Sequence, residues 1–151
     1  MKRNLFFFLI FMFLCPVISE AAKTQENLNI KDIFRIYGKK KNVTMVELSK
    51  EMLDTYDITF YKSITINNDP EALAFIRKCL EKDQDGAHKI KEVMSDGGLI
   101  SAYYQIPGKD NAVNRFILFK VSQKGVITLI YIEGELDSDD LITILFTKKD
   151  L

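Results

Sequence analysis

The stretch from His88 to Glu133 reads HKIKEVMSDGGLISAYYQIPGKDNAVNRFILFKVSQKGVITLIYIE, and it decides the fold. Four segments rich in apolar residues are separated by clusters of turn-forming residues, which is the pattern of an antiparallel meander. Asp96-Gly97 favours a tight type I′ hairpin, Pro107-Gly108 begins a longer loop, and Gly125 permits the third turn. We therefore predict four consecutive strands.

The last two of these strands, Val113–Ser122 and Val126–Glu133, are almost continuously apolar. Such strands are typical of central positions that are covered at least in part on both faces. One layer of helices can bury only one face of the sheet, so a second apolar face remains. This second face is the feature that most favours an interaction surface. Its candidate residues are Tyr103, Tyr104, Phe119 and Tyr131. β-propensity and ordinary half-burial in a sheet explain the same aromatic residues more simply.

The chain before the meander predicts two further strands and two helices. Val43–Leu48 and Asp57–Asn67 have strand character, and Ser49 can cap a short helix between them. A longer helix begins at Pro70, after capping residues, and its apolar stripe places Cys79 on the buried side. With a closing helix after Asp137 or Ser138, we predict one α+β domain. Its mainly antiparallel sheet has five or six strands, with two or three helices mostly on one face.

The N-terminus is typical of a secretory signal peptide. Lys2 and Arg3 precede an apolar run of 14 residues, Leu5–Ile18, whereas a membrane-spanning helix needs about 20. We expect cleavage after Ala21 and contact with the membrane only through the uncleaved signal. We expect no lipid anchor at Cys15, because Leu14 stands where bacterial lipoproteins have a small residue.

The remaining chain divides into an arm and a domain. Residues 22–42 are predicted to form a flexible or partly helical arm, with a short amphipathic helix between Ile30 and Tyr37, and residues 43–151 form the domain. Basic and acidic residues number 21 each, and removal of the signal leaves 19 and 20, so nucleic acid is not an expected partner. Cys79 is then the single thiol, which excludes an intramolecular disulfide.

Two candidate sites lie near the end of the long helix. Glu81, Asp83, Asp85 and Glu92 fall at positions one, three, five and twelve of a calcium-binding EF-hand loop, but such a loop needs a helix where we predict a strand. Cys79 and His88 could form a nucleophile and base, but helical phase buries the thiol. We therefore expect no metal and no cofactor.

No motif identifies a catalytic site. The sequence has no G-x-S-x-G, no phosphate-binding glycine loop and no H-E-x-x-H, and its many carboxylates include pairs such as Glu133 and Glu135 that no pattern singles out. We predict a binding module without catalytic activity. The alternative is a hydrolase-like enzyme that uses carboxylates in a cleft.

Several loose motifs carry a family resemblance. They are V-x-x-V-x-L-S-K-x-M-L from Val43, D-P-E-A-L from Asp69 and I-x-G-E-L-D-x-x-D-L from Ile132. With the signal peptide and the meander, they make the chain similar to a family of small exported proteins of unknown function, found chiefly in Bacteroidales and related Bacteroidota. The resemblance implies an extracytoplasmic α+β domain, periplasmic or extracellular, with an unknown protein or small ligand as partner. It provides no catalytic residues.

The signal-peptide hypothesis predicts the mass of the exported protein. Cleavage after Ala21 gives a chain that begins near Ala22, and intact-mass spectrometry of the exported protein measures this directly. A retained N-terminus, or an added lipid mass on Cys15, would contradict it.

Overall fold

The structure, a computed structural model, describes residues 27–108 and 113–147. The predicted signal peptide lies outside the described residues. In chain order the elements are α1 (Ile30–Tyr37), β1 (Val43–Glu47), α2 (Lys50–Asp54), β2 (Ile58–Asn67), α3 (Pro70–Asp83), β3 (His88–Ser95), β4 (Gly98–Ile106), β5 (Asn114–Val121), β6 (Val126–Gly134) and α4 (Ser138–Thr147).

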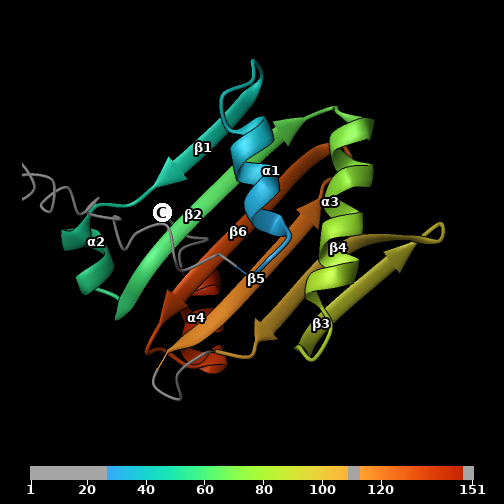
Figure 1. Ribbon diagram of the computed structural model, residues 1–151. Helices are drawn as coiled ribbons and strands as arrows, with labels where there is room; N and C mark the ends of the chain where they lie inside the picture. Colours follow the sequence, from blue (N-terminus) through green and yellow to red (C-terminus); the bar gives the residue numbers. More distant parts are fainter. Residues whose placement is uncertain (1–26, 109–112, 148–151) are drawn as a thin grey trace, which may run out of the picture.

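The strands form one antiparallel sheet in the order β1-β2-β6-β5-β4-β3 (Figure 1). From β3 to β6 each strand pairs with the next, so the predicted meander is confirmed. β6 also pairs with β2, which places β5 and β6 inside the sheet, as their apolar sequences predicted. The α+β class is likewise confirmed, and the sheet has six strands where five or six were predicted.

The hairpin between β3 and β4 has the predicted geometry. Ser95 pairs with Gly98, so the turn contains two residues, Asp96 and Gly97. Their φ angles are 50° and 75°, and a type I′ turn requires positive values at both positions. His88–Ser95 is therefore an edge strand rather than the second helix of a calcium-binding hand.

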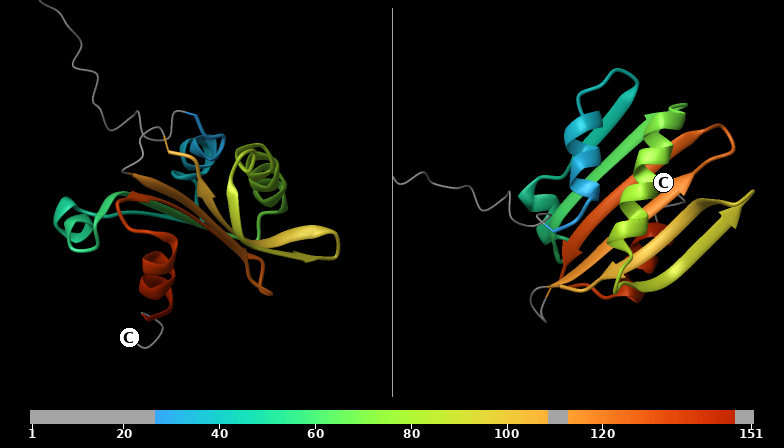
Figure 2. Two further views of the ribbon diagram at one scale, coloured as in Figure 1. Left: turned by 90° about the horizontal axis from the view of Figure 1, so that it is seen from below. Right: turned by 45° about the vertical axis from the view of Figure 1, so that its right-hand side comes forward.

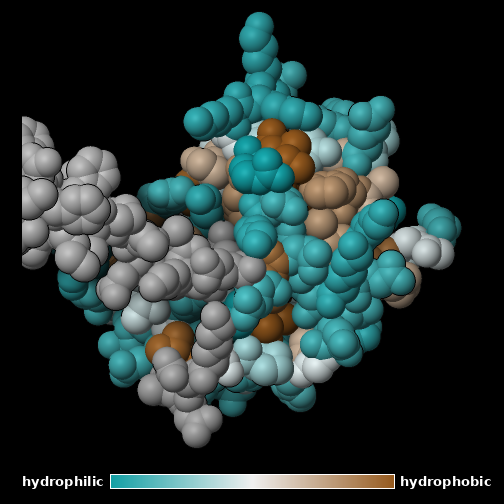
Figure 3. Space-filling model, in the orientation of Figure 1, coloured by the Kyte–Doolittle hydropathy of each residue, from teal (hydrophilic) through white to brown (hydrophobic). Residues whose placement is uncertain are grey.

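One face of the sheet, called here the α1/α3 face, is covered by α1 and α3 (Figures 1 and 2). Alternate residues of the inner strands point into this layer, and each fully buried aliphatic side chain contributes about 1.5–3 kcal/mol. The sheet side chains of this core include Ile64, Ile66, Tyr104, Ile117, Phe119, Ile127, Leu129 and Tyr131. The outer surface of the two helices is mostly hydrophilic, with apolar atoms visible between them (Figure 3).

The opposite face, called the α4 face, holds a smaller core. It comprises Ile58, Tyr103, Phe116, Ile132, Leu136 and Leu141, with Leu53 and Tyr56 from α2 and the following turn packed against it. In Figure 2, left, α4 extends away from the sheet and does not lie along it. α4 therefore covers one end of this face and leaves the rest of the central strands without a helix over them.

The helices differ from the expected arrangement. The described residues contain α1 in the predicted arm and three helices in the domain, as expected, but these helices are shared between the two faces, whereas the sequence predicts them mostly on one. The predicted helix of the N-terminal arm is α1, and its Ile30, Ile33 and Phe34 are buried in the main core. No helix among these residues is long and apolar enough to cross a membrane.

Asp83, at the end of α3, holds the beginning of α1. Its Oδ1 accepts hydrogen bonds of 2.7 Å from the backbone N–H and the side-chain amide of Asn29, and its Oδ2 accepts one of 2.8 Å from the backbone N–H of Ile30. Asn29 occupies the N-cap position of α1 but makes no capping bond with its own side chain. A carboxylate 53 residues away therefore satisfies N–H groups that the helix leaves unpaired.

We predict that Asp83→Ala lowers the free energy of unfolding by about 2–4 kcal/mol, because it leaves buried donors without an acceptor. Urea denaturation measures the loss, and amide hydrogen exchange should accelerate first in α1. Asp85→Ala is the matched control, since Asp85 is exposed and should change stability by less than about 0.5 kcal/mol. Equal effects of the two substitutions would contradict this role of Asp83.

Candidate functional site

A groove of about 410 Å³ lies on the part of the α4 face that α4 does not cover. It is lined by Lys91, Ser101, Ala102, Tyr103, Leu118, Phe119, Lys120, Thr128 and Ile130. We call this feature the groove. Strand alternation turns the side chains of Ala102 and Phe119 into the opposite core, so the other seven side chains define its surface.

Strand register arranges the groove in two rows across the sheet. Leu118 lies opposite Tyr103 on β4 and opposite Ile130 on β6, which makes an apolar row. Two residues along, Lys120 lies opposite Ser101 and Thr128, which makes a polar row. The surface therefore changes from apolar beside the α4 core to two hydroxyl groups and the Lys120 ammonium about 7 Å further along the strands, and Lys91 lies at the edge-strand end of the apolar row.

Tyr103 forms the boundary between the groove and α4. Its hydroxyl donates a hydrogen bond of 3.3 Å to the carbonyl of Ser138, at the start of the helix. Burial, with a smaller effect of Asp139 and Asp137, raises the pKa of Tyr103 above its usual range. Tyr103 thus remains a protonated donor at neutral pH and fixes α4 beside the apolar row.

Two lysines line the groove without a carboxylate partner. Lys91 lies opposite Tyr103 on the edge strand β3, and Lys120 stands in the polar row. The ion pairs among the described residues join other groups, and the lining of the groove contains no Asp or Glu. The groove therefore combines an apolar floor with two uncompensated positive charges.

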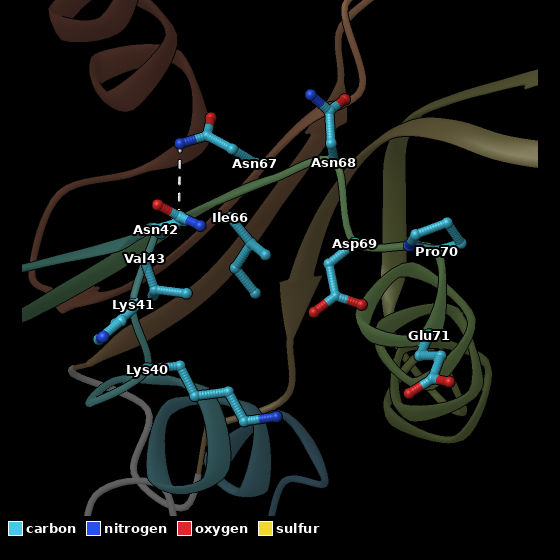
Figure 4. A pocket seen from close by; sticks show the side chains of 10 residues that line it. All are labelled: Lys40, Lys41, Asn42, Val43, Ile66, Asn67, Asn68, Asp69, Pro70 and Glu71. Atoms are coloured by element: carbon cyan, nitrogen blue, oxygen red, sulfur yellow. Dashed lines mark hydrogen bonds between the residues drawn. The ribbon is translucent and has the colours of Figure 1, made fainter.

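A second hollow, of about 510 Å³, is lined by residues 40–43 and 66–71. Side chains reach it from the α1–β1 loop and from the β2–α3 connection (Figure 4). Two of its polar side chains already have partners within the fold: Asp69 Oδ1 accepts from the Ala72 N–H at 2.9 Å, and Asn67 donates to the Asn42 carbonyl at 3.4 Å. We favour the groove, because ligand sites are mostly apolar with a few available polar groups.

A buried polar network lies under the α1/α3 layer and uses Arg115, Tyr131 and Glu133. Arg115 Nε donates to the Tyr131 hydroxyl at 2.9 Å, and that hydroxyl donates to Glu133 in a short bond. Arg115 also donates through Nη1 to the Pro107 carbonyl at 3.3 Å. Burial raises the pKa of Glu133, against the opposing effects of Tyr131 and Arg115. The network ties the loop after β4 to the sheet.

Comparison with protein-family models assigns residues 17–145 to a family of unknown function, DUF6108. The chain belongs to this family. The match includes every described strand and the beginning of α4. No curated protein matches the chain.

The four aromatic residues proposed as an interaction face do not share a face. Tyr104, Phe119 and Tyr131 point into the α1/α3 core, whereas Tyr103 belongs to the core of the α4 face. At 8% Tyr103 is the most exposed of them, so none offers a free aromatic ring. Only Tyr103 lines the groove with its side chain.

The four calcium candidates are dispersed. Asp83 caps α1, Glu92 accepts a short hydrogen bond from the Tyr104 hydroxyl, and Glu81 and Asp85 are exposed. Within residues 27–108 and 113–147 no three His, Cys, Asp or Glu side chains are grouped to hold a metal ion.

The other two candidate pairs are also placed by the structure. Cys79 is buried, and burial raises the pKa of its thiol to about 11, whereas His88 is exposed on β3. A protonated, buried thiol is a poor nucleophile. Glu133 is buried in the polar network, whereas Glu135 is exposed beyond the end of β6.

The sequence analysis did not single out Lys91, Lys120 or Leu118. A signal for Lys120 was present, because it interrupts an apolar alternation that also contains Phe116 and Leu118. Lys91 carried no comparable signal, since its proximity to Tyr103 depends on the β3–β4 register, which shifts between Lys89 and Lys91.

We predict a specific pH dependence for Glu133→Gln. Glu133 has a pKa above 4.5 in the folded protein, so its contribution to stability is fully present below the unfolded pKa and is lost as pH rises through the folded pKa. The stability of the wild type relative to Glu133→Gln should therefore fall as the pH rises above about 4.5. Urea midpoints at four pH values measure this difference. If the wild type instead became more stable relative to Glu133→Gln as the pH rises, the raised pKa of Glu133 would be contradicted.

Proposed function

We propose that the chain is an exported cell-envelope protein that binds a small ligand in the groove and catalyses no reaction. The basic start and the short apolar run Leu5–Ile18 support export to the periplasm or beyond.

The observation that carries the binding proposal is the partial exposure of two apolar side chains in the groove, Leu118 and Ile130. Leu118 and Ile130 are only half-buried, although they lie on the two innermost strands of the sheet. Phe116 and Ile132, two residues away on the same strands, are buried in the core of the α4 face. A volume of about 410 Å³ is within the range of small-molecule sites, about 300–1,000 Å³.

The available side chains support binding more than hydrolysis. A carboxylate-based hydrolase needs two acids that reach one cleft, and the lining of the groove provides hydroxyl and ammonium groups only. Asp69 lines the polar hollow but caps α3, and Asp83 and Glu133 are bound within the fold. These three acids therefore already have hydrogen-bond partners within the fold.

We predict that the exported protein retains a small molecule from envelope extract and that Leu118→Thr with Ile130→Thr abolishes this retention. Threonine keeps β-propensity but makes the apolar row polar. Retained molecules are identified by mass spectrometry after solvent extraction of the purified protein.

Val46→Thr is the matched control, since Val46 is 41% exposed on the edge strand β1 and does not line the groove. Circular dichroism and the melting temperature establish that each variant is folded. Retention by the folded double variant equal to that of the wild type, or no retained molecule at all, would overturn the proposed function.

A further inference from the structure

We propose that the ligand of the groove is a single-chain fatty acid, bound with its alkyl chain on the apolar row and its carboxylate at the polar row. This inference rests on the proposed binding function and deepens it by naming the chemical class. It is argued from the order of the rows, the charge of the groove and its size.

The order of the rows matches an amphiphile. From the α4 core outward, β5 presents Phe116, Leu118 and Lys120 on this face, so the surface changes from buried apolar to half-buried apolar to cationic. The four residue-to-residue steps from Phe116 to Lys120 span about 13 Å. A linear molecule with one apolar end and one polar end fits this gradient when its chain points toward α4.

The charge of the groove selects an anionic head group. Lys91 and Lys120 line it, and neither forms an ion pair or hydrogen bond with another described residue. Asp137 and Asp139 flank Ser138, whose carbonyl accepts the hydrogen bond of Tyr103 at the start of α4. A carboxylate at Lys120 would also meet the hydroxyls of Ser101 and Thr128, so each oxygen can accept a hydrogen bond.

The size of the groove favours one alkyl chain over a protein partner. Nine residues line it, whereas a standard protein interface uses about 20–30 residues on each side. Its 410 Å³ lies in the lower part of the range for small-molecule sites, which suits a single chain better than a two-chain phospholipid.

The direct test is calorimetric titration of the full exported protein with decanoate, which remains monomeric at millimolar concentration. We expect saturable binding at one site. Hexanoate should bind at least tenfold more weakly, because it buries about four fewer methylene groups. Decan-1-ol, which has the same chain without the charge, should also bind more weakly than decanoate.

Charge reversal distinguishes a specific effect of the groove lysines on decanoate affinity from a general effect of net charge. Lys91→Glu with Lys120→Glu should weaken decanoate binding by roughly tenfold or more and leave decan-1-ol unchanged. The control is Lys39→Glu with Lys78→Glu, which changes the net charge equally at two exposed positions outside the groove. This control should bind decanoate like the wild type.

Three outcomes would overturn the proposal: no saturable binding of decanoate, no loss in the groove variant, or an equal loss in the control. Flotation with phosphatidylglycerol vesicles tests a membrane surface as the alternative partner, and binding to vesicles without binding to decanoate also overturns it. If envelope extract yields a different molecule whose retention requires Leu118 and Ile130, the fatty-acid inference fails while the proposed function stands.

Discussion

The pairing of β5 with β6 is the constraint on which the rest of the structure depends. Both strands are apolar at consecutive positions, so their alternation sends large side chains to both faces of the sheet. The side chains on one face are buried by α1 and α3, and those on the other face need a second layer to bury them. Because register fixes which residue faces which way, a shift by one residue would exchange the two sets.

The two faces are covered unequally, and the groove is a direct result. α1 and α3 enclose the larger core, and the carboxylate of Asp83 joins the two helices at their ends. On the other face α4 covers the end that contains Phe116 and Ile132, while Leu118 and Ile130 remain half-buried. The same strands thus build the interior on one side and a candidate ligand surface on the other.

Much of the fold was predictable because its signals are local. The hairpin at Asp96-Gly97 and the helix start at Pro70 depend on a few adjacent residues, and both are confirmed. The partner of β6 was not predictable, because β2 and β6 are far apart in the sequence. The role of Asp83 was hidden for the same reason, since its acceptors serve a helix that begins 53 residues earlier.

The candidate site was predicted only in outline. A second apolar face was expected, but the aromatic residues proposed for it were chosen without knowing which face of the sheet each one occupies. Tyr103 and Tyr104 are adjacent and therefore point to opposite faces, which strand alternation alone requires. The lysines of the groove come from β3 and β5, strands that are separated by β4, so only the assembled sheet places them around one surface.

The central place of β6 also affects when this protein can fold. β6 pairs with β2 on one side, as in the pair Ile64 and Leu129, and with β5 on the other. It therefore joins β1-β2 to β5-β4-β3, and it follows all of these strands in the sequence. A nascent chain without β6 holds β1-β2 and β5-β4-β3 as separate fragments, each with an unpaired inner edge. Folding dominated by such distant contacts is slow and waits for nearly the whole sequence. The sheet is therefore completed only after β6 has been synthesised.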